Sequence, residues 1–199
     1  ARTALLSAVS HDLRTPLAGI KAAIGSLRSH EVEFSPEDRA ELEEAIDDSA
    51  DRLESLIGNL LDMSRLQVGA LVAHPRLTDL GEIVPAAIIG SAATGRVTWT
   101  LGEGARYAEA DPGLLDRVLS NLLENAMRHH DDPAKIRVTT SRIRDEVQLR
   151  VIDSGPGIPE AMREPAFQPF QRHTDSGGSG VGLGLAVARG LAEAMGGTL

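Results

Sequence analysis

The sequence predicts an α+β protein in which an N-terminal antiparallel helical hairpin is followed by a two-layer α/β sandwich domain. Apolar residues recur at steps of three and four, the helical period, from Leu6 to Met63. Beyond residue 79 the period changes, and short apolar segments typical of strands mix with helical segments. We therefore expect the hairpin in residues 1–72, a linker in residues 73–79 and the sandwich domain in residues 80–199.

The first helix carries one apolar stripe. Two consecutive steps of four residues fall beside Pro16, where an interior proline removes a backbone hydrogen bond, so we expect a kink there. His11 lies two residues from both Val9 and Leu13, about 200° around the helix from each, and should face solvent. The stripe consists of Leu6, Val9, Leu13, Leu17, Ile20, Ile24 and Leu27.

A second helix should begin near Ser35 and run to about Gly69. Ser35 is a favourable N-cap, Pro36 suits the first helical position, and the acidic residues that follow suit the positive end of the helix dipole. One heptad seam contains Leu42, Ile46, Leu53, Leu56, Leu60 and Met63, with Ser49 in the remaining position. A lone hairpin leaves apolar surface bare, so we expect two copies to form a four-helix bundle. An intramolecular coiled coil packed on the next domain is the alternative.

The second part should contain three strands and two helices. Residues 97–101, 135–143 and 146–152 are predicted strands, the last two joined by a hairpin turn at Arg144-Asp145. Asp111-Pro112 should cap a helix that runs to about His130, and a further helix should follow Gly182.

The composition of the chain argues against several classes of function. A net charge of −9 argues against a nucleic-acid partner, because a phosphate backbone requires a basic face. The absence of cysteine excludes disulfides and thiolate chemistry, and fits a cytoplasmic setting. No apolar run is long enough to span a membrane. Because the chain does not begin with Met, we expect it to be a fragment of a longer protein.

Several polar groups have the chemistry of a phosphate site. Asp12 is placed to accept the Nδ1 proton of His11, which would leave Nε2 as a nucleophile, although a plain surface histidine is the simpler interpretation of its position. Asn121 and Asn125 lie one turn apart, and amide oxygens are suitable ligands for Mg²⁺. Four alternate glycines, Gly178 to Gly184, precede an apolar helix, and their backbone N–H groups could bind an anion. A dinucleotide fold is excluded, because no strand directly precedes these glycines.

Four motifs in this order resemble the H, N, G1 and G2 boxes of sensor histidine kinases. Within that family, Ile20-Lys21-Ala22-Ala23 is most similar to the potassium-responsive Kdp sensor kinases. The motifs are Ser10-His-Asp-Leu-Arg-Thr-Pro-Leu17, Asn121 to His129, Asp153-Ser-Gly-Pro-Gly157 and Gly178 to Leu185. The resemblance implies a sandwich domain of the gyrase and histidine-kinase type.

The resemblance also implies the roles of individual residues. His11 would be the phosphoacceptor, Asp12 the base that activates it, and Thr15 the residue that orients water in the reverse, phosphatase direction. Phe167 and Phe170 resemble the F box that anchors a lid over ATP, although a structural role for one of them is equally open. The expected ATP contacts are Asn121 and Asn125 through Mg²⁺, Arg128 at the phosphates, His129 near the ribose or base, Asp153 at the adenine amino group, Gly155 and Gly157 at the pocket floor, and Gly180, Gly182, Gly184 and Leu185 in the phosphate loop.

The expected activity is ATP-dependent autophosphorylation of His11, followed by phosphotransfer to the receiver domain of a response regulator. The expected state is a soluble cytoplasmic homodimer whose longer parent is attached to a membrane. An ATP hydrolase of the gyrase or MutL type is the main alternative, but that group has a glutamate where this chain has Asn121. A nucleotide-binding dimer scaffold without catalysis is a further alternative. Family members continue into two more strands after Leu199, so we expect the second domain to be incomplete at its C-terminus.

Overall fold

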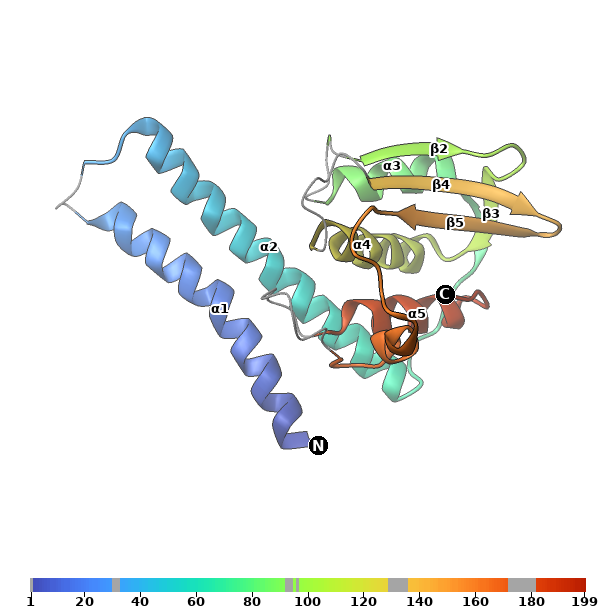
Figure 1. The fold of residues 1–199 in the computed structure, drawn as a ribbon, viewed down its shortest axis with the longest axis horizontal. Helices are drawn as coiled ribbons and strands as arrows, with labels where there is room; N and C mark the ends of the chain where they lie inside the picture. The colour runs from blue at the N-terminus through green and yellow to red at the C-terminus, as the bar shows by residue number, and fades with distance from the viewer. Residues whose placement is uncertain (1, 30–32, 92–94, 96, 129–135, 172–181) are drawn as a thin grey trace. The chain divides into compact units, whose positions relative to one another are not determined.

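The structure, a computed structural model, describes residues 2–29, 33–91, 95, 97–128, 136–171 and 182–199 (Figure 1). The described residues fall into two compact units. The N-terminal unit ends at Leu61, and the C-terminal unit begins at Asp62. The second helix therefore contributes its last turns to the C-terminal unit. Each unit is described by itself below.

The N-terminal unit is the predicted helical hairpin, built from α1 (Arg2–Arg28) and the greater part of α2 (Pro36–Gln67). Helix α1 continues through Pro16. Helix α2 begins at a reciprocal cap, in which Ser35 Oγ accepts from the Asp38 amide at 3.0 Å and Asp38 Oδ2 accepts from the Ser35 amide at 3.2 Å. This cap satisfies amides that have no partner within the helix, and it confirms the predicted start.

The apolar surface of the hairpin is wider than one seam can cover. Met63 is buried, but Leu60 of the predicted seam is exposed, and Asn59 is buried in its place. The predicted seam belongs to a bundle of two copies, so the exposure of Leu60 in a single copy does not contradict it. In a single copy the exposed large apolar side chains of α1 and α2 are Leu17, Ile24, Ile57, Leu60 and Leu61.

The C-terminal unit is the predicted mixture of strands and helices. A three-stranded sheet has the order β2-β4-β5, with β2 parallel to β4 and β4 antiparallel to β5. A separate antiparallel pair joins β1 to β3. The elements are β1 (Arg76–Asp79), α3 (Leu80–Ile89), β2 (Val97–Leu101), β3 (Tyr107–Ala110), α4 (Pro112–Arg128), β4 (Ile136–Ile143), β5 (Glu146–Ile152), the short 3₁₀ turns η2 (Glu160–Met162) and η3 (Pro165–Phe167), and α5 (Gly184–Ala194).

Most of the predicted elements are confirmed, and three others were missed. Strands β2 and β5 have the predicted bounds, and the hairpin turn places Arg144 in the left-handed region at φ 57°. Strand β1 occupies residues assigned to the linker, while α3 and β3 were not predicted. Strands β1 and β3 are four residues long and partly exposed, so they carry too little periodicity to be recognised.

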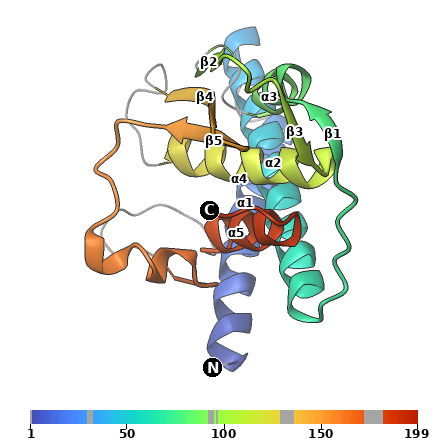
Figure 2. The ribbon, with the colours of Figure 1, turned by 90° about the vertical axis from the view of Figure 1, so that its right-hand side faces the viewer.

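The core lies between the sheet and the helices α3 and α4. Figures 1 and 2 show α5 on the side of α4 away from the sheet, so α4 is covered on two faces. Leucines of α4 pack toward α3 and β4, whose facing residues are also buried. The core residues are Leu80, Val84, Ala87, Ile88, Leu119, Leu123, Ala126, Ile136 and Val138.

Asp111 fixes where α4 begins. Its Oδ1 accepts from the amides of Gly113 and Leu114, and its Oδ2 accepts from the amide of His74 at 2.9 Å. The hydrogen bond from the His74 amide is the largest cause that holds the pKa of Asp111 below its ordinary value, with the Leu114 and Gly113 amides adding to it against some desolvation. One carboxylate therefore caps α4 and holds the segment before β1 against it.

We expect Asp111→Ala to lower the free energy of unfolding by about 1 kcal/mol, because the helix loses its cap and the His74 amide loses its acceptor. Since the folded pKa is lowered, the contribution of Asp111 is fully present above the unfolded pKa and is lost as the pH falls through the folded pKa. The difference in the free energy of unfolding between wild type and variant, measured in urea, should thus have its full value at pH 7 and decrease below about pH 4. Glu109→Ala, which removes an exposed carboxylate nearby, is the control, and an equal loss in both variants would contradict the capping role.

Candidate functional site

His11 presents an exposed imidazole whose orientation is set by a buried neighbour. The His11 side chain is 75% exposed, and its Nδ1 lies 3.0 Å from Oδ1 of Asp12, whose side chain is only 3% exposed. An ionised carboxylate only accepts hydrogen bonds, so this contact places the imidazole proton on Nδ1 and leaves the Nε2 lone pair available. The prediction that His11 faces solvent and pairs with Asp12 is confirmed.

Two further polar groups lie next to this pair, the second oxygen of Asp12 and the hydroxyl of Thr15. Asp12 Oδ2 is buried and has no hydrogen-bond partner among the described residues. Thr15, one turn after His11, donates from its hydroxyl to the His11 carbonyl oxygen at 3.3 Å. The Thr15 side chain is exposed, one helical turn from His11.

Asn121 of α4 is buried, although asparagine is a polar residue. Its Nδ2 donates to the Arg117 carbonyl oxygen at 2.9 Å, and a Cβ built on Gly184 would lie 3.1 Å from its Oδ1. Helix α5 starts at Gly184 and covers this face of α4. Farther along α4, Asn125 is half-buried and Arg128 is exposed. Of the predicted nucleotide contacts on α4, the amide of Asn121 is thus oriented by its neighbours before any ligand arrives.

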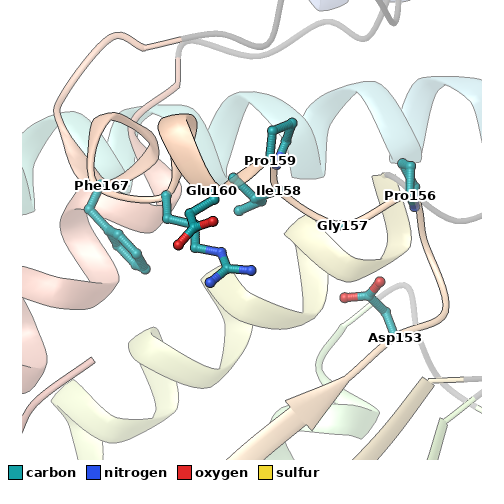
Figure 3. Close-up of a pocket in the computed structure, with 8 residues that line it drawn as sticks. Asp153, Pro156, Gly157, Ile158, Pro159, Glu160 and Phe167 are labelled. Atoms are coloured by element: carbon teal, nitrogen blue, oxygen red, sulfur yellow. The ribbon is translucent and has the colours of Figure 1, made fainter.

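Asp153 follows β5 and lines a cleft of about 720 Å³. Its Oδ1 accepts from the Gly155 amide at 2.7 Å, which leaves Oδ2 free to accept from a ligand. Figure 3 shows Asp153 and Phe167 on opposite sides of this cleft. The remaining lining is the end of the G1 motif, the two residues directly after it, and the start of η2 with its C-cap. It consists of Pro156, Gly157, Ile158, Pro159, Glu160 and Arg163.

Sequence reasoning missed part of this lining. Ile158 and Pro159 give the cleft apolar surface suited to a flat ring, and Glu160 and Arg163 add charge at its wall. Their only sequence signal was their place immediately after Asp153-Ser-Gly-Pro-Gly157. The cleft lining does not include Asn121, Asn125 or Gly182, so it forms one part of the predicted nucleotide site and not all of it.

A backbone hydrogen bond joins the end of the glycine-rich motif to one of the F-box residues. The Phe170 amide donates to the Gly182 carbonyl oxygen at 2.9 Å, and both residues are in the left-handed region, at φ 67° and 68°. A Cβ on Gly182 would lie 2.3 Å from the Gln171 carbonyl oxygen, so only glycine fits there. Leu185 is half-buried in the first turn of α5. The predicted site residues His129 and Gly180 lie outside the described residues.

Comparison with known proteins shows two family matches that together cover most of the chain. Residues 1–69 match the His Kinase A (phospho-acceptor) domain, and residues 110–199 match the histidine kinase-, DNA gyrase B-, and HSP90-like ATPase family. Matches to both modules, in this order, define the catalytic portion of a sensor histidine kinase. The chain belongs to this family of two-component signalling proteins, and its second module is of the ATP-binding class.

The chain is similar to individual sensor kinases in sequence and in fold. Over its whole length the chain is 50% identical to the sensor protein KdpD of Mycobacterium tuberculosis, and it spans 24% of that protein. The histidine kinase AdeS of Acinetobacter baumannii shares its fold, with a TM-score of 0.65 at 21% identity over 92% of this chain and 86% of that one. Full-length ShkA in complex with AMPPNP is 28% identical, with a TM-score of 0.58 over 96% of this chain and 41% of that one.

We expect Gly182→Ala to destabilise the C-terminal unit more than Gly157→Ala does. Both glycines have positive φ, which costs an alanine about 1–2 kcal/mol, but only at Gly182 would the added Cβ also collide with backbone. At Gly157 no atom lies within 4 Å of the added Cβ. Urea unfolding of both variants measures the difference. Equal destabilisation would show that the backbone of Gln171 does not approach Gly182 as closely as described.

Proposed function

We propose that this chain catalyses ATP-dependent phosphorylation of its own His11 and then passes the phosphoryl group to an aspartate of a response regulator. One observation supports this above the others. His11 is an exposed imidazole held by a buried carboxylate in the tautomer that frees Nε2, in a chain whose second unit has a nucleotide-type cleft.

The proposed reaction is an in-line phosphoryl transfer. Nε2 of His11 forms a bond to the γ-phosphorus while the bond from that phosphorus to the β,γ-bridging oxygen breaks, and ADP leaves. The imidazole gains positive charge as the new bond forms, and Asp12 stabilises it through the Nδ1 proton. Because this transfer requires chiefly positioning and charge neutralisation, no further nucleophile is required. In the reverse, phosphatase direction we propose that Thr15 orients a water molecule.

We propose that ATP is bound with Mg²⁺. Asn121 fits this role because its Nδ2 is already used by the Arg117 carbonyl, which leaves Oδ1 as the free polar atom, and Gly184 has no side chain to cover it. Asn125 and Asn121 would supply amide oxygens to the metal, and Mg²⁺ would neutralise charge on the phosphates. Arg128 would contact the phosphates, with Asp153 Oδ2 accepting from the adenine amino group above Gly155 and Gly157. Gly180, Gly182, Gly184 and Leu185 would bind the phosphates, and His129 would lie near the ribose or base.

The chemistry favours a kinase over an ATP hydrolase. A hydrolase of the gyrase or MutL type needs a carboxylate one turn before the metal-binding asparagine, and this chain has the amide of Asn121 there. An amide cannot remove a proton from water. Glu124 lies about 100° around the helix from Asn125 and is poorly placed to replace it. Phosphate release without a phosphoenzyme would favour the hydrolase, and nucleotide binding alone would favour a scaffold.

We further propose that the chain works as a homodimer within a membrane-attached parent, with this portion in the cytoplasm, as the resemblance to Kdp sensor kinases implies. Within the described ranges, no helix combines the length and the apolar character needed to cross a bilayer. The proposed domains are the hairpin in residues 1–72, the linker in 73–79 and the ATP-binding domain in 80–199, with β1 adding a strand at the end of the linker.

We expect the chain to acquire label from ATP carrying radioactive γ-phosphate, and His11→Gln to abolish that label while ADP binding is kept. Asp12→Asn should reduce the rate by about 10²-fold or more, because the Nδ1 proton loses its acceptor charge. Omission of Mg²⁺ should also prevent labelling. The label is located by mass measurement of the peptide that contains His11. Undiminished label in His11→Gln would refute the assignment.

We expect the chain to sediment as a dimer, and Leu17→Asp combined with Ile57→Asp to shift it to monomer. Both side chains are exposed on the hairpin in a single copy, and a buried unpaired carboxylate is costly at an interface. Ile89→Asp is the control, because Ile89 is equally apolar and exposed but lies on α3. A wild-type monomer at micromolar concentration would refute the dimer, and monomerisation by the control would show that the hairpin is not the interface.

A further inference from the structure

Arg189 of α5 makes two kinds of contact with the segment that contains η3. Its guanidinium pairs bidentately with Glu164, with distances of 3.1 Å from Nη1 to Oε2 and 3.0 Å from Nη2 to Oε1. The same guanidinium lies over the Phe167 ring, with Cζ 4.5 Å from the ring centroid. Glu193, one turn along α5, adds a weaker contact at 3.7 Å. Arg189 is thus held in place by carboxylates while its flat face covers an aromatic ring.

The ring that Arg189 covers is a wall of the nucleotide cleft. Phe167 lines the cleft opposite Asp153 (Figure 3). The cleft lining contains none of the residues proposed to bind the phosphates on α4 and α5, so Phe167 borders the part that would receive the nucleoside. Phe167 is half-buried at the end of the short 3₁₀ turn η3, and the guanidinium over one face of its ring restrains the ring.

Helix α5 connects this wall to the rest of the site. Its first residue, Gly184, lies against Asn121, and Arg189 lies more than one turn further along the same helix. We propose that Arg189 is a positioning residue for nucleotide binding: through Glu164 and Phe167 it fixes the cleft wall to the helix that follows the phosphate loop. This inference rests on the proposed nucleotide-binding function.

The alternative is an ordinary surface ion pair. Glu164 is 79% exposed and Arg189 is 28% exposed, and pairs of this kind contribute little to folding stability. The hydrogen bond from Arg189 holds the pKa of Glu164 below its usual value, so this carboxylate stays ionised to a lower pH than an unpaired glutamate. The two explanations differ in what they predict for ligand affinity, because a surface pair alone would leave ADP binding unchanged.

The chain contains a matched control. Arg106 donates from Nε and Nη2 to one oxygen of Asp79, Oδ2, at 3.0 and 2.9 Å, and it lies over the Tyr107 ring, with Cζ 5.7 Å from the ring centroid. This trio also combines a guanidinium, a carboxylate and an aromatic ring, but none of its members lines the cleft. Arg106→Met and Arg189→Met both remove a guanidinium and keep most of the hydrocarbon stem.

The experiment measures dissociation constants for ADP and for adenosine by calorimetry on the full chain. We expect Arg189→Met to weaken binding of both ligands about three- to tenfold, by the same factor, because the wall borders the nucleoside and not the phosphates. Arg189→Lys, which keeps the charge but not the planar fork, should show a smaller loss. Arg106→Met should leave both constants at the wild-type value.

A double-mutant cycle tests whether Arg189 acts through the ring. If it does, Arg189→Met should cost much less in a Phe167→Leu background than in wild type. Unchanged ADP affinity in Arg189→Met overturns the proposal, as do equal losses in Arg189→Met and Arg106→Met, or full additivity with Phe167→Leu. A loss for ADP that spares adenosine also overturns it, since that would make Arg189 a phosphate contact. If the wild type itself binds neither ligand, the proposed nucleotide-binding function is refuted, and the positioning role of Arg189 is refuted with it.

Discussion

Helix α4 has to satisfy neighbours on two faces, and the geometry of the C-terminal unit depends on that constraint. One face places Leu119 and Leu123 in the core with α3 and the sheet. The other face is covered by α5, so Asn121 is buried where a free helix would be wet. A buried amide must find partners, and Asn121 finds the Arg117 carbonyl for its nitrogen. Its oxygen is therefore oriented by packing before any ligand is present.

The elements that the sequence predicted are those whose signal is local. The capping pair of Ser35 and Asp38 and the cap at Asp111 involve residues within three positions of one another, and both helices start where the sequence places them. Strands β2 and β5 belong to a sheet whose core side is apolar, and their bounds were also predicted. The pairing of His11 with Asp12 is local as well, because the two residues are adjacent in the chain.

What the sequence could not predict depends on contacts distant in the chain. Strand β1 pairs with β3 about thirty residues later, and neither has enough length to show a period. Pro85 lies inside α3, and proline in a sequence usually argues against a helix at that position. The burial of Asn121 comes from Gly184, and the restraint on Phe167 comes from Arg189. The motifs thus indicated candidate site residues, and the tertiary fold decides which of these candidates are oriented by their neighbours.

The exposure of His11 follows from the chemistry proposed for it. A phosphoacceptor that receives its group from ATP and gives it to a receiver aspartate must be reachable by two partners in turn, so it cannot be enclosed in either site. An exposed imidazole would ordinarily exchange between tautomers, and only one of these leaves Nε2 free. Asp12 resolves this conflict, because a carboxylate that is itself buried fixes the proton on Nδ1 without covering the ring. Burial of Asp12 is costly, and its Oδ2 has no hydrogen-bond partner among the described residues. In the proposed reaction this desolvation has a use, because a buried carboxylate stabilises positive charge on a neighbouring imidazole more strongly than an exposed one does.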